Sequence, residues 1–185
     1  MQIEETNLSG VVVITPARHG DERGFFSESW NAARMREAGL DIAFVQDNHS
    51  LSEARGTLRG LHFQSPPHAQ AKLVRCGRGA IWDVAVDIRR GSPTYGQSFG
   101  TELSFKNGRQ LLVPEGFLHG FVTLEPMSEV VYKCSDFYAP DCDGAVRWDS
   151  CGIDWPLSDA PVLSAKDAAA PALSAFVSPF EWSAS

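Results

Sequence analysis

Short apolar runs, broken by turn residues, follow one another along most of the chain. The clearest run lies between Trp82 and Ile88, where apolar side chains at every second position alternate with Asp83 and Asp87. Because successive side chains of a strand point to opposite faces, this period of two predicts a strand with one apolar and one polar face. The same pattern predicts strands at residues 11–15, 24–30, 43–46, 58–63, 72–76, 80–88, 98–105, 110–113, 117–124 and 129–134.

One stretch, residues 31–38, is typical of a helix. Asn31 can cap its first turn, and Gly39 can end it in the left-handed conformation. A second short helical turn is expected at residues 166–170. Many short strands with few helices indicate an all-β sandwich or barrel, and the commonest way to close one of this size is an antiparallel jelly roll.

The length of 185 residues suits one domain with a sizeable core. Hydrophobic residues make up 43% and charged residues 21% of the chain, which is the balance of a folded globular protein and not of a disordered one. The sequence has no internal repeat and no linker. We therefore expect a single domain over residues 1–185, with its core at about 10–170 and a surface tail at 171–185.

The net charge of -7 argues against a broad nucleic-acid surface, because phosphate backbones are bound by clustered Lys and Arg. A few cations in a cleft can still bind a small anion. No apolar run is long enough to cross a bilayer, and residues 1–9 are acidic and polar in place of a signal peptide. We expect a cytoplasmic protein without a membrane partner, and therefore reduced cysteines. The cysteines form no C-x-x-C pair; they are Cys76, Cys134, Cys142 and Cys151.

The run Leu58-Arg59-Gly60-Leu61-His62-Phe63-Gln64 combines a cation, an imidazole and an amide within a strand pattern. A single histidine in a strand is more often structural than functional. Here His62 and Gln64 share one face, which is therefore polar and points either to solvent or into the lumen of a barrel. Arg59 would point away from His62 on a regular strand, unless a bulge at Gly60 turns it.

Three further side chains have both a structural and a chemical interpretation. Lys72 has the position of a solvated lysine at a strand end. Tyr132 shares its face with Val130 and Cys134, which is the pattern of a core tyrosine whose hydroxyl is hydrogen-bonded. Asp167 has the position of a carboxylate favoured by the dipole of a helix N-terminus. None of these side chains indicates a function by itself.

The run Pro114-Glu115-Gly116-Phe117-Leu118-His119-Gly120 resembles the second motif of the cupin superfamily, whose barrels often hold a metal. The first cupin motif normally offers an H-x-H pair, whereas this chain has His62-Phe63-Gln64. Zinc, iron and manganese sites need three or four convergent ligands, and only His62 and His119 are in place. The resemblance supports a cupin-like barrel, but we expect no metal.

Several separate blocks of the chain resemble the dTDP-4-dehydrorhamnose 3,5-epimerase family. They occur in the order and with the spacing of that family, from about Gly10 to Ala170. Agreement of several blocks in order is far more specific than any single motif. The resemblance implies a cupin-like jelly-roll β-barrel. The blocks are GDERGFF (20–26), FVQDNHS (44–50), LRGLHFQ (58–64), KLVR (72–75), IWDVAVD (81–87), VPEGFLHGF (113–121) and LSAKD (163–167).

The resemblance implies an enzyme that inverts C3 and C5 of a dTDP-linked 4-keto-6-deoxyhexose and gives dTDP-4-dehydro-L-rhamnose for dTDP-L-rhamnose biosynthesis. The C4 ketone acidifies both neighbouring C–H groups, so no cofactor is needed, but a base, a group that holds the enolate charge and an acid are needed. In the pattern of the family, His62 is the base and Asp167 orients it. Lys72 faces the enolate oxygen. Tyr132 returns a proton from the opposite face, since a phenol stays protonated near neutral pH.

The same resemblance implies which residues hold the substrate. Cationic side chains match contacts to phosphate and sugar, and Tyr138 takes the place of the aromatic side chain that stacks on thymine. Asp143 departs from the pattern, which has a longer glutamate at this place. The family also implies a homodimer in which strands near the N-terminus contribute to the neighbouring site. The implied binding residues are Arg23, Phe26, Glu28, Gln46, Asn48, Arg59, His119, Tyr138, Asp143 and Lys166.

Three alternatives stay open at this stage. A mono-epimerase acting at C3 or C5 of a related nucleotide keto-sugar would share most of these side chains, although the intact Tyr132 favours inversion at both carbons. A metal-dependent cupin enzyme is disfavoured by Gln64. A non-catalytic sugar-binding barrel would not need the four catalytic side chains together. The sequence also leaves open whether Asp83 is a partner of His119 or a solvated acid.

Overall fold

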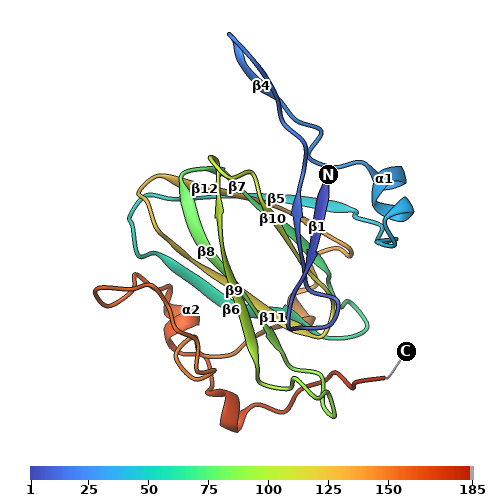
Figure 1. The fold of residues 1–185 in the computed structure, drawn as a ribbon. Coiled ribbons are helices and arrows are strands. Elements are labelled where there is room, and N and C mark those ends of the chain that lie inside the picture. The colour runs from blue at the N-terminus through green and yellow to red at the C-terminus, as the bar shows by residue number, and fades with distance from the viewer. Residues whose placement is uncertain (184–185) are drawn as a thin grey trace.

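Two antiparallel sheets face each other and enclose the apolar side chains of the alternating runs (Figure 1). The structure, a computed structural model, describes residues 1–183. The larger sheet contains, in spatial order, β1 (Gln2–Glu5), β2 (Val12–Thr15), β10 (Gln110–Val113), β7 (Lys72–Arg78), β12 (Ser128–Cys134) and β5 (Gln46–Ser52). The second sheet contains β13 (Asp143–Ala145), β6 (Leu58–Gln64), β11 (Phe117–Thr123), β8 (Ala80–Asp87) and β9 (Ser98–Ser104). This architecture confirms the predicted antiparallel, jelly-roll class.

The strand β8 is buried on both faces, including the face that carries Asp83 and Asp87. Ile81, Asp83 and Ala85 point between the two sheets, where apolar side chains from both sheets form one cluster. Val84 and Val86 point outward and pack under the C-terminal part of the chain. Each such fully buried aliphatic side chain stabilises the fold by about 1.5–3 kcal/mol.

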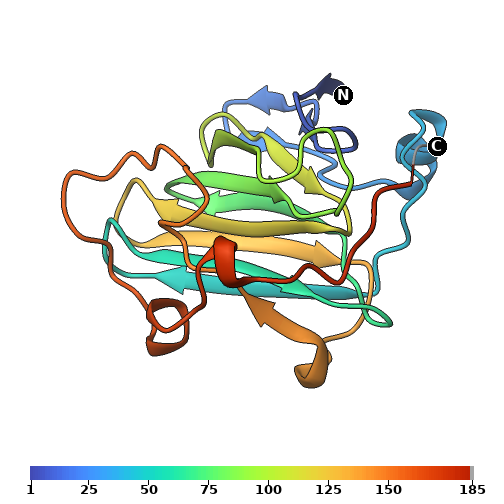
Figure 2. The same cartoon turned by 90° about the horizontal axis from the view of Figure 1, so that it is seen from below.

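The C-terminal segment covers the outer face of the second sheet (Figure 2). Phe180 is buried there, and its ring lies 6.1 Å from that of Phe63 in an edge-on arrangement. The Arg90 amide donates to the Phe180 carbonyl at 3.0 Å. Two 3₁₀ helices, Pro140–Cys142 and Leu173–Ala175, lie in this part of the chain. The segment expected as a surface tail therefore adds apolar side chains to the core.

The helix α1 (Ala32–Glu37) confirms the predicted helix and its capping. The Asn31 side chain accepts a hydrogen bond from the Arg34 amide at 3.2 Å, and Gly39 follows with a φ of +84°. Met35 packs against the outer face of the larger sheet, in an apolar cluster with Val12, Ile14, Leu73 and Leu112. The second predicted helical turn is α2 (Ala165–Ala168), which begins one residue earlier than expected.

Two of the predicted strands were wrong in their bounds. The run at 24–30 contains only the short β4 (Gly24–Phe26), which pairs with β3 (His19–Asp21) in a hairpin that projects from the sheets (Figure 1). The run at 43–46 is not a strand; β5 begins at Gln46 and continues to Ser52. The strand was missed because one face of β5 is exposed and the other is polar, so it has no apolar period. The short β1, β3 and β13 were missed as well.

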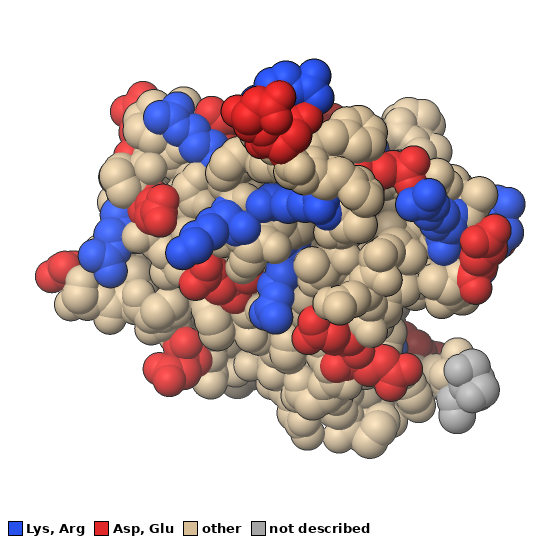
Figure 3. All heavy atoms as spheres, turned by 45° about the horizontal axis from the view of Figure 1, so that its top comes forward, with Lys and Arg blue, Asp and Glu red and all other residues tan. Residues whose placement is uncertain are grey.

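Two further features of the chain bear on its expected environment, namely its cysteines and the lengths of its helices. All four cysteines are free thiols, as predicted. In the described part of the chain, residues 1–183, no helix has the length and hydropathy to span a membrane. On the face that Figure 3 shows, Lys and Arg side chains lie among Asp and Glu and do not form one broad basic surface.

Candidate active site

A bulge, which the sequence left open, is present in β6 and turns Arg59 to the same side as His62. His62 pairs with His119, and Arg59 pairs with Phe121, so two residues of β6 lie opposite one residue of β11. Gly60 makes this possible, since it has a φ of +131° and a Cβ on it would lie 2.6 Å from the Gly120 Cα. Both Arg59 and His62 therefore line one cavity between the sheets.

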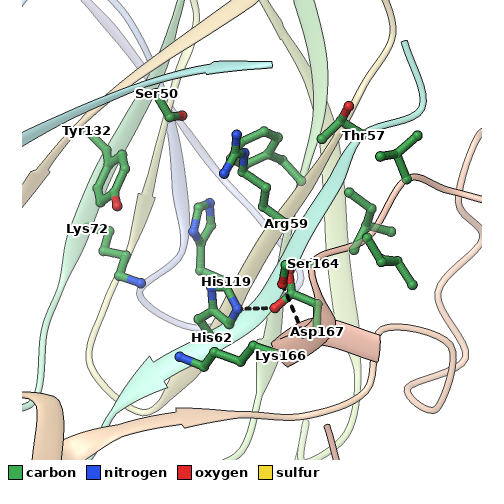
Figure 4. A pocket seen from close by; sticks show the side chains of 14 residues that line it. Ser50, Thr57, Arg59, His62, Lys72, His119, Tyr132, Ser164, Lys166 and Asp167 are labelled. Carbon is green, nitrogen blue, oxygen red and sulfur yellow. Dashed lines mark hydrogen bonds and ion pairs between the residues drawn. The ribbon is translucent and has the colours of Figure 1, made fainter. Parts of the chain in front are cut away.

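This cavity has a volume of about 420 Å³ and gathers half of the predicted site residues, including all four predicted catalytic ones (Figure 4). It joins a second cavity of about 490 Å³, because His62, Lys72 and Tyr132 line both. The predicted residues that line the first cavity are Arg59, His62, Lys72, His119, Tyr132, Lys166 and Asp167. Those that line the second are Gln46, Asn48, His62, Lys72, Tyr132, Tyr138, Asp143 and Lys166. The cations that a small anion needs are thus inside the cavity.

His62 and Asp167 form a close pair at one wall of the first cavity. The Nε2 atom of His62 lies 2.5 Å from Oδ1 of Asp167, which is buried in the first turn of α2. The Ser164 hydroxyl accepts a hydrogen bond from the Asp167 amide at 3.1 Å and so fixes the start of that turn. A carboxylate only accepts hydrogen bonds, so Nε2 carries a proton and Nδ1 keeps its lone pair in the neutral imidazole. Burial lowers the pKa of His62, although the hydrogen bond that His62 donates to Asp167 opposes this shift.

Lys72 and Tyr132 face the same space from the larger sheet, opposite His62 (Figure 4). Burial lowers the pKa of the Lys72 ammonium group, and nearby acidic groups partly oppose this effect. Burial raises the pKa of the Tyr132 phenol, so the phenol keeps its proton at neutral pH. The cavity therefore brings together a neutral imidazole, an amine and a protonated phenol.

His119 has a carboxylate partner of its own, which answers the question that the sequence left open. Its Nε2 atom lies 2.8 Å from Oδ1 of Asp83, and both side chains are buried. Asp83 is therefore a partner of His119 and not a solvated acid. In the described part of the chain, no three His, Cys, Asp or Glu side chains converge as metal ligands.

Tyr138 and several polar side chains around it line one end of the second cavity. Lys166 forms an ion pair with Asp143, and the Tyr138 hydroxyl donates to Asp143 at 3.4 Å. Gln46 accepts a hydrogen bond from the Tyr138 amide at 3.0 Å and donates to Asn48 at 3.1 Å. Tyr138 itself is 59% exposed. This end of the cavity offers an aromatic face beside one cation and one carboxylate.

Three predicted binding residues lie outside both cavities. Arg23 is exposed on the projecting hairpin and is paired with Asp21. Phe26 is 71% exposed on the same hairpin, and Glu28 pairs with Arg34 at 3.1 Å. Within one chain, Arg23, Phe26 and Glu28 therefore do not line the site.

Three polar side chains that line the first cavity were not predicted as site residues: Ser50, Thr57 and Ser164. Ser50 lies on the same face of β5 as Asn48, and its buried Oγ has no hydrogen-bond partner. The period of two would have placed Ser50 beside Asn48 if β5 had been recognised as a strand. Ser164 caps α2, and its position three residues before Asp167 is a usual capping signal.

Comparison with known proteins agrees with the resemblance of the sequence blocks. The family model "dTDP-4-dehydrorhamnose 3,5-epimerase" matches residues 5–175. A dTDP-4-dehydrorhamnose 3,5-epimerase of Salmonella typhimurium is 52% identical over 176 residues, which cover 94% of this chain and 96% of that protein. The crystal structure of a dTDP-6-deoxy-D-glucose-3,5-epimerase from Legionella pneumophila, in complex with dTDP-4-keto-L-rhamnose, is 45% identical with a TM-score of 0.94, over 99% of each chain. A Bacillus anthracis dTDP-4-dehydrorhamnose 3,5-epimerase with TDP and PPi bound is 47% identical with a TM-score of 0.90, over 93% of this chain and 99% of that one.

Proposed function

Because the chain belongs to the dTDP-4-dehydrorhamnose 3,5-epimerase family and has its epimerase activity, we propose how its own residues carry out the two inversions. The observation that carries this proposal is the single cavity in which His62, paired with Asp167, faces Lys72 and Tyr132. Membership of this family decides against the metal-dependent cupin and the non-catalytic barrel. No step below needs a metal or a cofactor, since the C4 ketone of the substrate is the electron sink.

We propose that His62 is the base for the protons at C3 and C5. Its lowered pKa keeps the imidazole neutral near pH 7, which is the form that accepts a proton. The proton goes to Nδ1, because Nε2 is bonded to Asp167. The imidazolium that forms is then stabilised by the carboxylate at 2.5 Å, in the same way as behind other catalytic histidines.

We propose that Lys72 stabilises the enolate oxygen that develops at C4. A buried cation acts strongly on a developing negative charge. The C–H bond breaks as its electron pair moves toward the ketone, and the oxygen gains the charge that Lys72 faces. Collapse of the enolate then takes up a proton on the other face of the carbon.

We propose that Tyr132 donates this proton. Its raised pKa keeps the phenol protonated, and it lines the cavity from the sheet opposite to His62. Removal of a proton on one face and return on the other inverts the carbon. The same pair of groups serves C3 and C5 in turn, once the sugar ring has been repositioned.

We propose that the nucleotide part of the substrate binds along the second cavity, beside the first. We propose that Arg59 and Lys166 bind the phosphates and that Tyr138 stacks on the base, with Asp143 at its side. The relatives with TDP or dTDP-4-keto-L-rhamnose bound support a dTDP-linked ligand. Gln46, Asn48 and His119 complete the proposed contacts from β5 and β11.

We propose that the chain works in the cytoplasm as a homodimer of single-domain subunits. The projecting hairpin supports a dimer, because it holds Arg23 and Phe26 away from the cavity of their own chain. In the dimer these two residues and Glu28 would complete the site of the partner. The free state of all four cysteines is consistent with a reducing compartment.

The test is proton exchange in deuterated water with dTDP-4-dehydro-6-deoxyglucose, followed by NMR. The parent enzyme should place deuterium at C3 and C5, and His62→Ala should abolish most of the exchange at both carbons. Tyr132→Phe should keep proton exchange at the carbon that is deprotonated first. Its rate of net inversion should fall by about 10²–10⁴-fold. Tyr95→Phe, an exposed tyrosine outside both cavities, is the matched control. Full exchange and inversion without His62 would contradict the proposal.

A further inference from the structure

Gln64 uses its whole side-chain amide on backbone groups of two loops beside the second cavity. It is 4% exposed and lies at the end of β6. Its Nε2 donates to the His68 carbonyl at 2.7 Å and to the Phe137 carbonyl at 3.1 Å. Its Oε1 accepts from the Ala139 amide at 2.9 Å. Gln64 therefore bonds to the backbone on both sides of Tyr138.

Two other glutamines bond to the same loop from different parts of the chain. Gln70 donates to the Asp136 carbonyl at 2.8 Å, and Gln46 accepts from the Tyr138 amide at 3.0 Å. Gln46 belongs to the larger sheet and Gln64 to the second sheet, so the loop at 136–139 is held from both sheets at once. Side-chain amides thus bond to four backbone groups of this loop, the carbonyls of 136 and 137 and the amides of 138 and 139.

The ring of Tyr138 depends on this support more than a core aromatic would. The side chain is 59% exposed, and its hydrogen bond is the 3.4 Å contact of its hydroxyl with Asp143. Little packing fixes the ring, so the direction in which it points follows from the backbone at 137–139. The amide of Gln64 sets that backbone.

An amide is the side chain that this position requires. It provides one acceptor and two donors at a single branch point, whereas a carboxylate only accepts and a neutral imidazole has one donor and one acceptor on opposite sides. Gln64 also stands where a metal-binding cupin would have the second histidine of its H-x-H pair. This chain uses the position to hold a loop.

We propose that Gln64 is a positioning residue for the nucleotide, which acts through the loop at 136–139 by fixing the direction of the Tyr138 ring. The inference rests on the proposed stacking of Tyr138 on the base. Gln64 contributes to nucleotide affinity, and the proton transfers at the sugar do not depend on it. This separates it from His62, two positions earlier on the same face of β6.

The first experiment measures Gln64→Met in the full-length enzyme. Methionine keeps the length of the side chain and removes all three hydrogen bonds. We expect KM for the nucleotide sugar and the Kd of dTDP to rise together by about tenfold, while kcat changes by less than about twofold. This pattern indicates that binding is weakened and that the chemical step is not. Asn107→Leu is the matched control, because Asn107 also bonds to three backbone groups, in the turn before β10, and lines neither cavity. It should leave Kd unchanged.

The second experiment repeats the substitution in a Tyr138→Ala background. If Gln64 acts through the ring, Gln64→Met should change the Kd of dTDP by less than about twofold once the ring is gone. Additive effects in the double variant would overturn the inference. A Tyr138→Ala variant with unchanged dTDP affinity would instead overturn the proposed stacking, which is a different outcome.

Gln64→Glu covers the case in which Gln64→Met does not fold. The glutamate keeps the acceptor for the Ala139 amide but turns a second oxygen toward two carbonyls. Its protonated form can donate again, so the Kd ratio of variant to parent should fall as the pH is lowered. A ratio that does not change with pH, together with a parent-like Kd, would exclude a role of Gln64 in nucleotide binding.

Discussion

His62 and His119 are register partners on neighbouring strands, yet each bonds through Nε2 to a different carboxylate. His62 pairs with Asp167 at 2.5 Å, and His119 pairs with Asp83 at 2.8 Å. The two pairs differ in access to the cavity, since the side chain of His62 is 31% exposed and that of His119 is 8% exposed. The same chemical pair therefore occurs twice, and the imidazole of His62 is the more exposed of the two.

Asp167→Asn should lower kcat by about 10²–10⁴-fold with a small change in KM. The asparagine oxygen can still accept the hydrogen bond from Nε2 of His62, but it cannot stabilise the imidazolium. Steady-state kinetics and C3/C5 exchange measure this effect. Asp154→Asn, an exposed acid outside the cavities, should behave like the parent. Parent-like kcat in Asp167→Asn would show that the carboxylate is not needed.

The acidic limb of kcat/KM should lie below pH 6.5, because burial lowers the pKa of His62 from that ordinary value. The sign for stability follows from the same shift. At a pH between the lowered pKa of the folded state and the ordinary value of 6.5, the unfolded chain binds more protons at His62 than the folded chain does. The contribution of His62 to stability is therefore present above pH 6.5 and is lost as the pH falls through the folded pKa.

Thermal unfolding and kcat/KM from pH 5 to 8 test this expectation. His62→Gln should remove the contribution of this residue to the slope of stability against pH. An acidic limb above pH 6.5 would mean that the charge of Asp167 outweighs burial.

Gly60→Ala should destabilise the fold and lower activity together. A Cβ at this position would lie 2.6 Å from the Gly120 Cα, so β6 and β11 would have to separate at the bulge that orients His62. Gly56→Ala is the control, because Gly56 also has a positive φ, of +78°, but its Cβ would meet nothing within 4 Å. We expect the control to lose about 1–2 kcal/mol and Gly60→Ala clearly more. Equal losses in urea unfolding would show that the close approach is unimportant.

Asp143→Glu should strengthen nucleotide binding by about two- to tenfold and leave kcat unchanged. The longer carboxylate restores the side-chain length of the family pattern and can still pair with Lys166. Isothermal titration with dTDP measures the change. Asp141→Glu, an exposed acid two residues earlier, should have no effect. Weaker binding in Asp143→Glu would indicate that the site has adapted to the shorter acid.

The alternation of side chains was enough to predict most strands but not the environment of their polar residues. Asp83 has the sequence pattern of a solvated residue and is buried, because the second sheet is covered outside by the C-terminal segment and closed inside by the larger sheet. A period of two says which face a residue is on, but not what covers that face. For this reason the strand β8 could be predicted, whereas the surroundings of Asp83 stayed open.

The site itself was predicted from the family resemblance and not from local patterns. His62 and Asp167 are separated by 105 positions, and no periodicity links a strand residue to a helix so far along the chain. For the hairpin of β3 and β4, the family resemblance was not sufficient either. Arg23 and Phe26 lie in a block that resembles the family, yet neither periodicity nor that block gives the direction in which the hairpin projects.

The late position of the C-terminal cover has a consequence during protein synthesis. As the chain leaves the ribosome, the strands β6, β8 and β11 are synthesised well before residue 167. His62 is therefore without the Asp167 carboxylate during this time. The cover of their outer face also stays incomplete until residues 173–181 emerge. The nascent chain can therefore build its lumen first, but it becomes an enzyme only after translation of the segment that both covers the sheet and brings Asp167 to His62.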